Sequence, residues 1–493
     1  MDSLSILWFV AYSVVVGLLS IYGMHRFWMV WTYYRHKNKR IEPLTRLKEL
    51  PLVTVQLPVF NEVYVVERLI RSVAAIDYPK DKLEIQVLDD STDDTTELVA
   101  KLTGELQLQG YDAVHIHRTN RQGFKAGALQ NGMRTAKGEF IAIFDADFVP
   151  PENILIDTIH YFSDPQIGMI QTRWGHINRG YNLLTRIQAL MLDGHLLIEQ
   201  TARNRSGRFF NFNGTAGVWR KVSIEEAGGW QHDTLTEDLD LSYRAQLKGW
   251  KFIFVPDVVT PAELPVDMNS FKAQQHRWAK GAIQTCFKLL PTIWNSPLPK
   301  RIKFEAMIHL VSNFAYLLLA MLALLVRPEF QRVGFSWESF LMIDMPIFCL
   351  ATLSIFVFYG TVLLELKKPW YIIPFYVPVL IATGIGLCLN NARAVLEAVF
   401  GHQSEFTRTP KYGIQTKVQT WWGKKYSATK SLVLFLELAL AAYYAWFIWY
   451  GVLHQLWISL PFFFLFFVGF GYAGLVSLFQ ALPFRLPLLS QRL

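Results

Sequence analysis

Two aspartates separated by one residue follow an apolar run near the first third of the chain. Asp145 and Asp147 come directly after Phe140–Phe144, so both carboxylates stand where a strand of this kind would end. Magnesium and similar hard cations are bound through one or two carboxylates together with phosphate oxygens of a substrate. The pair therefore indicates a cation site for a phosphate-bearing substrate. An ordinary solvated acidic turn is the alternative.

Two further acidic pairs occur in comparable places. Asp89 and Asp90 close the apolar run Ile85–Leu88, and Glu237 and Asp238 come later. Aspartate is also favoured in Asx turns and at helix N-termini for purely local reasons. Each pair, taken alone, is therefore compatible with a turn or a helix cap.

One later segment pairs a guanidinium with an indole. Arg277 and Trp278 are adjacent, and Gln274 lies three residues before Arg277. An arginine side chain binds phosphate through two parallel hydrogen bonds, and a tryptophan ring offers a flat face to a sugar. The pattern indicates contact with a phosphorylated sugar, and an Arg/Trp belt at a membrane interface is the alternative.

These residues need a scaffold, and the surrounding sequence predicts one. Short apolar runs alternate with stretches of helical character, which is typical of βαβ units and a mostly parallel sheet covered by helices on both faces. The expected elements are the strands Leu52–Leu57, Ile85–Leu88, Ala113–Ile116, Phe140–Phe144 and Ile167–Gln171 and the helices Val63–Ile76 and Ala126–Thr135. Because ligands of such sheets bind beyond the carboxyl ends of the strands, the acidic pairs are expected near one edge of an α/β domain.

The composition of the 493-residue chain indicates a membrane environment. Hydrophobic residues make up 52% and charged residues only 18%, whereas a soluble globular chain carries about 25% charged residues. The net charge of +8 comes from Lys and Arg beside apolar runs, which follows the positive-inside pattern and argues against nucleic acid as a partner. Three widely spaced cysteines cannot supply a disulfide framework or a four-ligand metal site.

Five apolar runs are expected to span the membrane. Leu4–Met24 is long enough to cross a bilayer, and basic residues follow it from Arg26 onward. A cleaved signal peptide has the opposite order, so we expect a retained anchor with the next domain on the cytoplasmic side. The four later runs are Phe304–Val326, Phe340–Leu364, Leu432–Leu453 and Leu456–Leu478. Tyr371–Leu389 is also apolar, but basic clusters flank it on both sides, so we predict an interfacial or re-entrant segment.

In this order and these strand contexts, the motifs resemble those of the family 2 glycosyltransferases, in particular the membrane-embedded processive branch that includes cellulose, mannan and hyaluronan synthases. The resemblance covers nearly the whole chain and rests on Leu57–Glu62, Asp89-Asp90, Asp145-x-Asp147, Thr236-Glu237-Asp238 and Gln274-x-x-Arg277-Trp278. The chain looks most similar to the cellulose-synthase-like mannan and glucomannan synthases of plants, through Gln122–Leu129, Phe212–Arg220, Gly249–Phe252 and Gln274–Gly281.

The resemblance implies a Rossmann-like α/β GT-A domain inserted between transmembrane helices, a nucleotide-sugar donor, a Mg²⁺ or Mn²⁺ ion, and inversion at the anomeric carbon. By position, Asp238 would be the general base, and Asp145 with Asp147 would bind the cation. The nucleotide sugar would also contact Glu62, Asp89, Asp90, Lys125 and Asp145. The diphosphate and the acceptor would contact Gln274, Arg277 and Trp278. The acceptor side would include Asn213, Gly214, Thr215 and Glu237.

Residues 405–411 resemble the mobile gating loop of these enzymes, in which a Phe-led motif closes over the donor. The residues expected to act there are Phe406, Arg408, Thr409 and Lys411. This role requires the cytoplasmic side, in agreement with a non-spanning 371–389, and an ordinary basic juxtamembrane loop is the alternative. The sequence Asn213-Gly214-Thr215 replaces the Cys-Gly-Ser that is usual in bacterial cellulose synthases, which argues against cellulose as the product.

The expected domains follow the chain in six parts. They are an N-terminal transmembrane helix (1–30), the transferase domain (50–267), interfacial helices with the QxxRW pattern (268–300), a transmembrane pair (303–366), the interfacial segment with the gating loop (367–430) and a second transmembrane pair (431–481). His309 and Asn313 share one helix face, where they can line a polysaccharide channel or join two helices.

We expect an inverting, processive β-glycosyltransferase that extends a β-1,4-linked glucan, mannan or glucomannan from UDP-glucose or GDP-mannose and moves the product across the membrane. A non-processive glycolipid synthase with a lipid acceptor is the first alternative. A membrane scaffold or transporter subunit with a degenerate transferase domain is the second. The expected location is the bacterial cytoplasmic membrane, or the Golgi membrane in a plant, as a multi-pass protein with its catalytic domain on the cytoplasmic side. The sugar, its linkage and any protein partners stay open.

Overall fold

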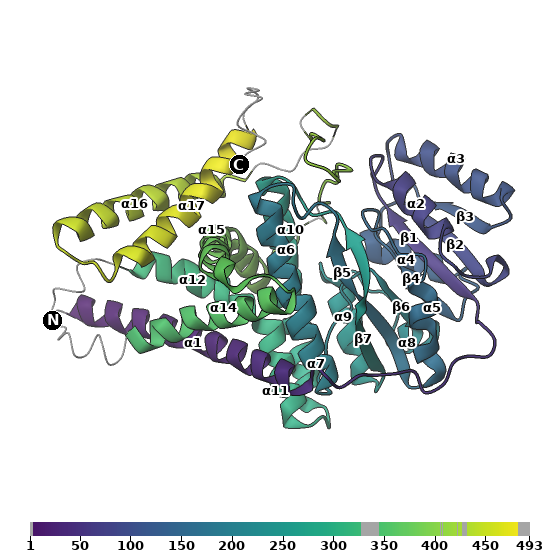
Figure 1. Cartoon of the computed structure of the whole chain (residues 1–493), viewed down its shortest axis with the longest axis horizontal. Coiled ribbons are helices and arrows are strands. Elements are labelled where there is room, and N and C mark those ends of the chain that lie inside the picture. Colours follow the sequence, from purple (N-terminus) through teal and green to yellow (C-terminus); the bar gives the residue numbers. More distant parts are fainter. Residues whose placement is uncertain are drawn as a thin grey trace.

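An α/β domain and a group of long helices make up the protein, with α10 (Met268–Asn295) between them (Figure 1). The computed structural model describes residues 3–326, 345–404, 406, 408–421, 423–425 and 431–481. The start of the expected span Phe340–Leu364, up to residue 344, lies outside the described residues. So do residues 405 and 407 of the expected gating loop and residues 422 and 426–430 of the expected segment 367–430.

A seven-stranded mixed sheet forms the centre of the α/β domain, in the order β3-β2-β1-β4-β6-β5-β7. The strands are β1 (Val53–Val59), β2 (Leu83–Asp89), β3 (Asp112–His117), β4 (Phe140–Ile143), β5 (Ile167–His176), β6 (Gly217–Arg220) and β7 (Lys251–Ala262). β1 pairs in parallel with β2 and β4, β2 with β3, and β5 with β7, whereas β6 is antiparallel to β4 and β5. The mostly parallel α/β sheet is therefore confirmed, and the carboxyl ends of β1, β2 and β4 meet at one edge.

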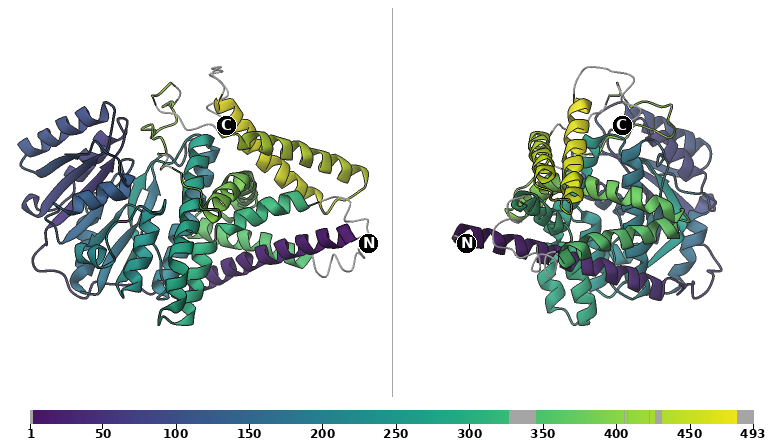
Figure 2. Two further views of the ribbon diagram at one scale, coloured as in Figure 1. Left: turned by 180° about the vertical axis from the view of Figure 1, so that it is seen from behind. Right: turned by 60° about the vertical axis from the view of Figure 1, so that its left-hand side comes forward.

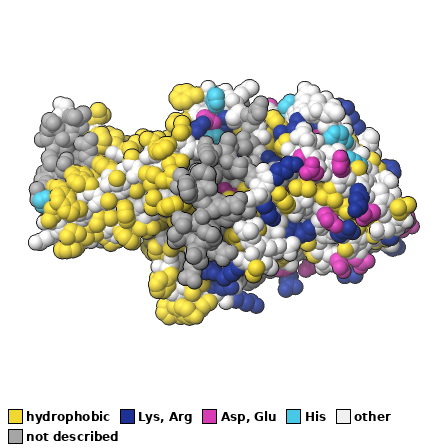
Figure 3. All heavy atoms as spheres, turned by 90° about the horizontal axis from the view of Figure 1, so that it is seen from above, with side chains coloured by type: hydrophobic (Ala, Val, Ile, Leu, Met, Phe, Trp, Pro, Cys, Tyr) yellow, Lys and Arg dark blue, Asp and Glu magenta, His cyan; other side chains and the backbone are white. Residues whose placement is uncertain are grey.

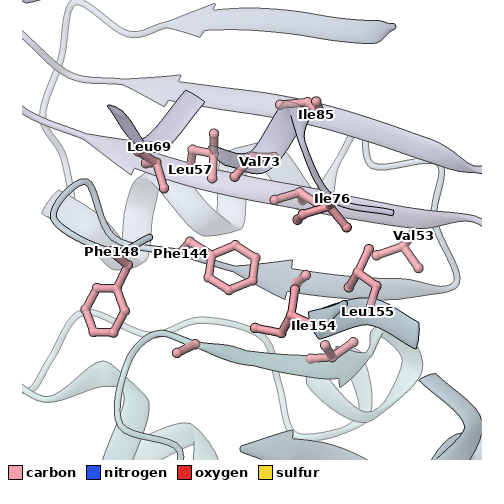
Figure 4. Packing of buried hydrophobic residues seen from close by; sticks show 14 of the residues in the cluster. Val53, Leu57, Leu69, Val73, Ile76, Ile85, Phe144, Phe148, Ile154 and Leu155 are labelled. Atoms are coloured by element: carbon pink, nitrogen blue, oxygen red, sulfur yellow. The ribbon is translucent and has the colours of Figure 1, made fainter. Parts of the chain in front are cut away.

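Helices cover both faces of this sheet, and each face has its own hydrophobic core. On one face lie α2 (Val66–Ala74), α3 (Thr95–Leu108) and α5 (Ile154–Ile159). On the other face lie α4 (Phe124–Met133), α8 (Lys221–Glu226) and α9 (Glu237–Leu247). Figure 4 shows Leu57 of β1 and Phe144, which directly follows β4, in the same cluster as Leu69 and Val73 of α2, and all four side chains are fully buried. Burial of each such side chain contributes about 1.5–3 kcal/mol to the stability of the fold. This packing holds the ends of the strands in place.

The remaining helices form the second part of the molecule (Figures 1 and 2). They include α1 (Ser3–His36), α6 (Leu183–Asp193), the π-helix η3 (Gly194–Gln200), α7 (Thr201–Arg205), α11 (Lys300–Val311), α12 (Phe314–Leu325), α14 (Met345–Glu365), α15 (Ile373–Val399), α16 (Val433–Leu453) and α17 (Leu460–Ala481). The short 3₁₀ turns are η1 (Lys80–Lys82), η2 (His160–Ser163) and η6 (Trp370–Ile372). α1 lies beside α14, and α16 lies beside α17.

Several of these helices have the length and composition of membrane spans. Within the described residues, Ile6–His36, Trp370–Val399, Val433–Leu453 and Leu460–Gln480 qualify, and α11 with α12, bent by 53°, would add a fifth if the pair is one span. Hydrophobic side chains gather over these helices, while charged side chains gather over the α/β domain (Figure 3). Residues 373–389 lie within α15, and residues 371 and 372 lie within η6. The interfacial or re-entrant path of this segment stays a prediction, as do the domain limits.

Candidate active site

A cavity of about 190 Å³ opens at the carboxyl ends of β1, β2 and β4. With the exceptions of Asp89 and Thr215, every residue expected to contact substrate or cation lines it. These are Glu62, Asp90, Lys125, Asp145, Asp147, Asn213, Gly214, Glu237, Asp238, Gln274, Arg277, Trp278, Phe406, Arg408, Thr409 and Lys411. Residues separated by more than 340 positions therefore share one cavity, and their individual roles stay predictions.

Asp145 and Asp147 follow β4, and each carboxylate is paired with a lysine. The Asp145 Oδ1 atom lies 2.5 Å from Nζ of Lys125, and the Asp147 Oδ2 atom lies 2.6 Å from Nζ of Lys411. The backbone N–H of Asp145 donates to the Thr215 hydroxyl oxygen at 2.9 Å, so Thr215 positions this turn from its buried place. Burial raises the pKa of Asp145, and Lys125 opposes this effect without cancelling it. Each of the two carboxylates pairs with a lysine ammonium group, and carboxylate oxygens of this kind are suitable ligands for a divalent ion.

The two aspartates at the end of β2 have different surroundings. Asp90 lines the cavity and accepts two hydrogen bonds from Arg118, at 2.7 and 2.5 Å. Asp89 is fully buried behind it and accepts hydrogen bonds from His115 and His117. Burial alone would raise the pKa of Asp89, but hydrogen bonds from His115 and Ser91 outweigh it and hold the pKa below its usual range. Of the two aspartates, Asp90 lines the cavity and Asp89 does not. We therefore predict that Asp90, rather than Asp89, contacts the nucleoside.

Asp238 is the second residue of α9, and its side chain lines the cavity. Its Oδ1 atom accepts the backbone N–H of Leu239 at 2.8 Å. Burial raises the pKa of Asp238 to about 7, and the neighbouring Glu237 adds to the increase. Gly214 approaches the other oxygen so closely that a Cβ atom there would lie 3.0 Å from Asp238 Oδ2. A carboxylate that titrates near neutral pH suits a general base.

The expected gating segment reaches the cavity through several contacts. Arg408 donates two hydrogen bonds to Glu62, at 2.9 and 3.0 Å. Burial raises the pKa of Glu62 to about 7 although Arg408 opposes the shift. The ring of Phe406 stacks on Phe124 at 5.8 Å, and the Arg277 guanidinium lies 4.5 Å from its centroid. This segment therefore lines the cavity and contacts Glu62 in the loop after β1, Phe124 of α4 and Arg277 of α10.

A second cavity of about 550 Å³ continues from the first into the helical part. The residues that line both cavities are Trp174, Leu192, Asn213, Thr236, Asp238, Gln274 and Trp278. His309 and Asn313 line the second cavity, and Nδ1 of His309 also lies 2.8 Å from the Tyr243 hydroxyl. Asp238 and Trp278 thus stand at the junction of the two spaces.

Three residues of this region were missed from the sequence. Arg118 pairs with Asp90, Arg121 lines the cavity with its guanidinium 3.3 Å from the Phe60 ring centroid, and Glu263 accepts the backbone N–H of Tyr412 at 3.0 Å. Arg118 directly follows β3 and Arg121 lies three residues further on, so their place after an expected strand was a usable signal. Glu263 follows β7, which the sequence did not predict as a strand.

The fold and the site define a GT-A-like mixed-sheet domain flanked by several apolar helices. Residues 51–281 match the family model described as "Glycosyltransferase like family 2". The chain therefore carries a family 2 glycosyltransferase domain, which confirms the family and the fold class expected from the sequence.

Two plant proteins illustrate the similarity. The chain is 45% identical to a probable glucomannan 4-beta-mannosyltransferase of Oryza sativa subsp. japonica over 238 residues, which make up 47% of the chain. Over 280 residues, 56% of this chain, it is 39% identical to a glucomannan 4-beta-mannosyltransferase of Cyamopsis tetragonoloba. The matches cover 41% and 53% of those relatives, so the chain spans about half the length of the curated relatives it matches.

A solved structure shares the fold. It is a mannosyltransferase from Pyrobaculum calidifontis in complex with GDP-Man and Mn²⁺, with a TM-score of 0.56 and 21% sequence identity. The match covers 80% of this chain and all of that one. At this level of identity, the similarity concerns the fold alone.

Proposed function

We propose that the chain is an inverting, processive β-glycosyltransferase that extends a mannan-type polysaccharide from GDP-mannose, with UDP-glucose as the donor for any glucosyl units. The observation that carries this proposal is the junction of the two cavities, where Asp238 and Trp278 face both spaces. A donor in the first cavity and an acceptor chain in the second would meet at Asp238. The names of the plant relatives support mannose as the sugar.

The transfer itself would depend on one carboxylate. Asp238 would accept the proton of an acceptor hydroxyl while that oxygen attacks the anomeric carbon and the nucleoside diphosphate leaves from the opposite face. A general base is most effective when its pKa lies near the working pH, and the pKa of Asp238, raised to about 7, meets this condition. One displacement of this kind inverts the anomeric centre without a covalent enzyme intermediate.

The leaving diphosphate would be held from two sides. Asp145 and Asp147 would hold a Mg²⁺ or Mn²⁺ ion, which when bound neutralises charge on the departing diphosphate. Arg277 and Lys411 would stabilise the same charge from the chain itself, because preorganised cations act most strongly where water is excluded. Lys411 is well placed to stabilise this charge, since its side chain is buried beside Asp147.

The lining of the second cavity favours a sugar polymer at its transferase end. Polar side chains, such as those of Gln188 in α6, His195 in η3 and Asn213, face this space, and Asn213 also lines the first cavity. Apolar side chains from the membrane helices, such as Leu319 and Phe466, line the remainder. Trp278 would stack on the acceptor sugar, and the product would move past it between the helices. We further propose that the transferase domain faces the cytoplasm, since basic residues follow α1.

The test uses the full chain in purified membranes with labelled GDP-mannose or UDP-glucose. We expect a high-mass, mannanase-sensitive product from GDP-mannose that is lost with EDTA and with Asp238→Asn. The matched control is Asp233→Asn, an exposed carboxylate of the preceding loop, which should retain activity. Full activity of Asp238→Asn would refute the assignment of the base. A chloroform-soluble product carrying one sugar would replace the processive reaction with glycolipid synthesis.

A further inference from the structure

Three potential metal ligands lie together beside the first cavity, which is the proposed donor site and is called the donor cavity below. His115 and His117 stand on β3, and Asp89 is the last residue of the neighbouring strand β2. One ligand atom from each residue lies within 4.8 Å of the other two. The register of the two parallel strands places Asp89 opposite His117. Because residues i and i+2 of a strand point to the same face, the pairing of two strands brings the three side chains together.

Both imidazoles point at the same carboxylate oxygen. Nε2 of His115 lies 3.0 Å from Oδ2 of Asp89, and Nδ1 of His117 lies 3.1 Å from it. The other oxygen, Oδ1, accepts the backbone N–H of Ser91 at 2.8 Å. Ligand atoms in a tetrahedral zinc site, with bonds of about 2.0–2.1 Å, lie about 3.3–3.4 Å apart. An opening of about 0.3 Å per contact would therefore admit an ion between the carboxylate and each imidazole.

The cluster combines a buried carboxylate with an accessible imidazole. The Asp89 side chain is fully buried, whereas the side chains of His115 and His117 are 17% and 36% exposed. β3 is the edge strand of the sheet, so an ion can reach His117 from solvent. A buried anion with two convergent nitrogen ligands and an open approach has the elements of a binding site rather than of a sealed hydrogen-bond network.

The ligand types select the class of ion. Imidazole nitrogen favours zinc and neighbouring transition metals, whereas Mg²⁺ and Ca²⁺ prefer oxygen ligands alone. We infer that Asp89, His115 and His117 bind a divalent transition-metal ion of the Zn²⁺ class, at a site separate from the cation proposed at Asp145 and Asp147. The fourth position is left for water or another small ligand.

Such an ion would link the ends of two strands at the wall of the donor cavity. Asp90, which lines the cavity, follows Asp89 directly, and Arg118 follows His117 directly. Asp90 and Arg118 form an ion pair. The ion would thus hold the Asp90–Arg118 pair in place. The inference does not depend on the proposed transferase reaction, because binding can be measured without donor or acceptor.

The experiment is a Zn²⁺ titration of the purified full chain in detergent, with saturating Mg²⁺ to occupy oxygen-only sites. We expect the variant His115→Gln/His117→Gln to lose one equivalent of Zn²⁺, with an affinity at least about tenfold lower at that site. His232→Gln, an exposed histidine outside the cluster, is the matched control and should bind as the parent chain does. Co²⁺ should give a visible spectrum of nitrogen-ligated, four-coordinate cobalt in the parent chain but not in the double variant.

Two further variants keep the outcomes separable. Asp147→Asn should retain the Zn²⁺ equivalent, whatever it does to sugar transfer. His117→Gln alone, on the exposed edge strand, tests the site if the double variant does not fold. Equal Zn²⁺ binding by the parent chain and the histidine variants would overturn the inference. So would loss of the equivalent in Asp147→Asn, which would assign the ion to the other site.

Discussion

Lys411 occupies the position that a cation at Asp147 would need, so its removal should strengthen metal binding in the absence of donor. Its Nζ atom lies 2.6 Å from Asp147 Oδ2, and it also donates to the Glu263 carbonyl oxygen at 2.9 Å. The two side chains are only 10% and 11% exposed, so solvent screens this pair little. Metal binding must first break this contact, and the variant Lys411→Met removes that step.

The size of the effect follows from the contact. A hydrogen bond to a charged group contributes about 1.5–3 kcal/mol, and about 1.4 kcal/mol changes an equilibrium constant tenfold. Lys411→Met should therefore bind Mn²⁺ about 10- to 150-fold more tightly than the parent chain when no donor is present. With donor present, the same variant should show a higher KM, because the ammonium that is proposed to stabilise the diphosphate is lost.

The assay measures free Mn²⁺ during titration of the purified full chain, followed by donor kinetics on the same samples. Lys425→Met is the matched control, since Lys425 pairs with Asp93 and Asp94 at a distance from Asp147. Unchanged Mn²⁺ affinity in Lys411→Met would refute the competition between lysine and metal. An equal gain in Mn²⁺ affinity in Lys425→Met would show that the effect comes from the change in overall charge.

Three further predictions concern the same cavity. The rate constant kcat/KM should rise with pH through a midpoint near 7, because Asp238 acts only when deprotonated and its pKa is raised to about 7; a pH profile flat from 5 to 8 would contradict this. Gly214→Ala should lower stability by about 1–2 kcal/mol, since φ is +81°, and should also lower kcat because its Cβ would meet Asp238. Gly207→Ala, with φ of +69° and nothing within 4 Å, should lose stability alone, as thermal unfolding and kinetics will show. Thr215→Val should weaken Mn²⁺ binding by leaving the Asp145 N–H unpaired, and Thr215→Ser should restore it; equal affinity in both variants would exclude this positioning role.

The acidic part of the site could be predicted because parallel strands bring their carboxyl ends to one edge. Asp90 and Asp145 follow strands that the apolar runs identified, so their meeting required only the sheet. The distinction between Asp89 and Asp90 could not be predicted in this way. Adjacent residues leave a strand on opposite sides, and which side faces the cavity depends on β3, whose histidines hold Asp89.

Contacts between segments that are far apart in the sequence could not be predicted from local sequence patterns. The four-residue strand β6 is too short to show a periodicity, yet it places Asn213–Thr215 beneath Asp145 by pairing with β4. The pairs Arg408–Glu62 and Lys411–Asp147 join residues 346 and 264 positions apart. Only the resemblance to known enzymes indicated that the segment around Phe406 reaches the cavity, because hydrophobicity and charge at those positions equally fit a surface loop.

The junction of the two cavities depends on how α10 is fixed. Lys272 lies buried between α16 and α17, where its Nζ donates to Glu437 at 2.6 Å and to Ser477 at 2.8 Å. Lys280, two turns further on, pairs with Glu397 of α15 at 3.0 Å. Arg277 and Trp278 lie between these anchors along the helix and line the cavities. Burial of such ion pairs gains little stability over apolar packing, but removal of one partner leaves a costly buried charge. The two lysines therefore fix the register of α10 against the apolar helices, and any movement of those helices would move Trp278 relative to Asp238.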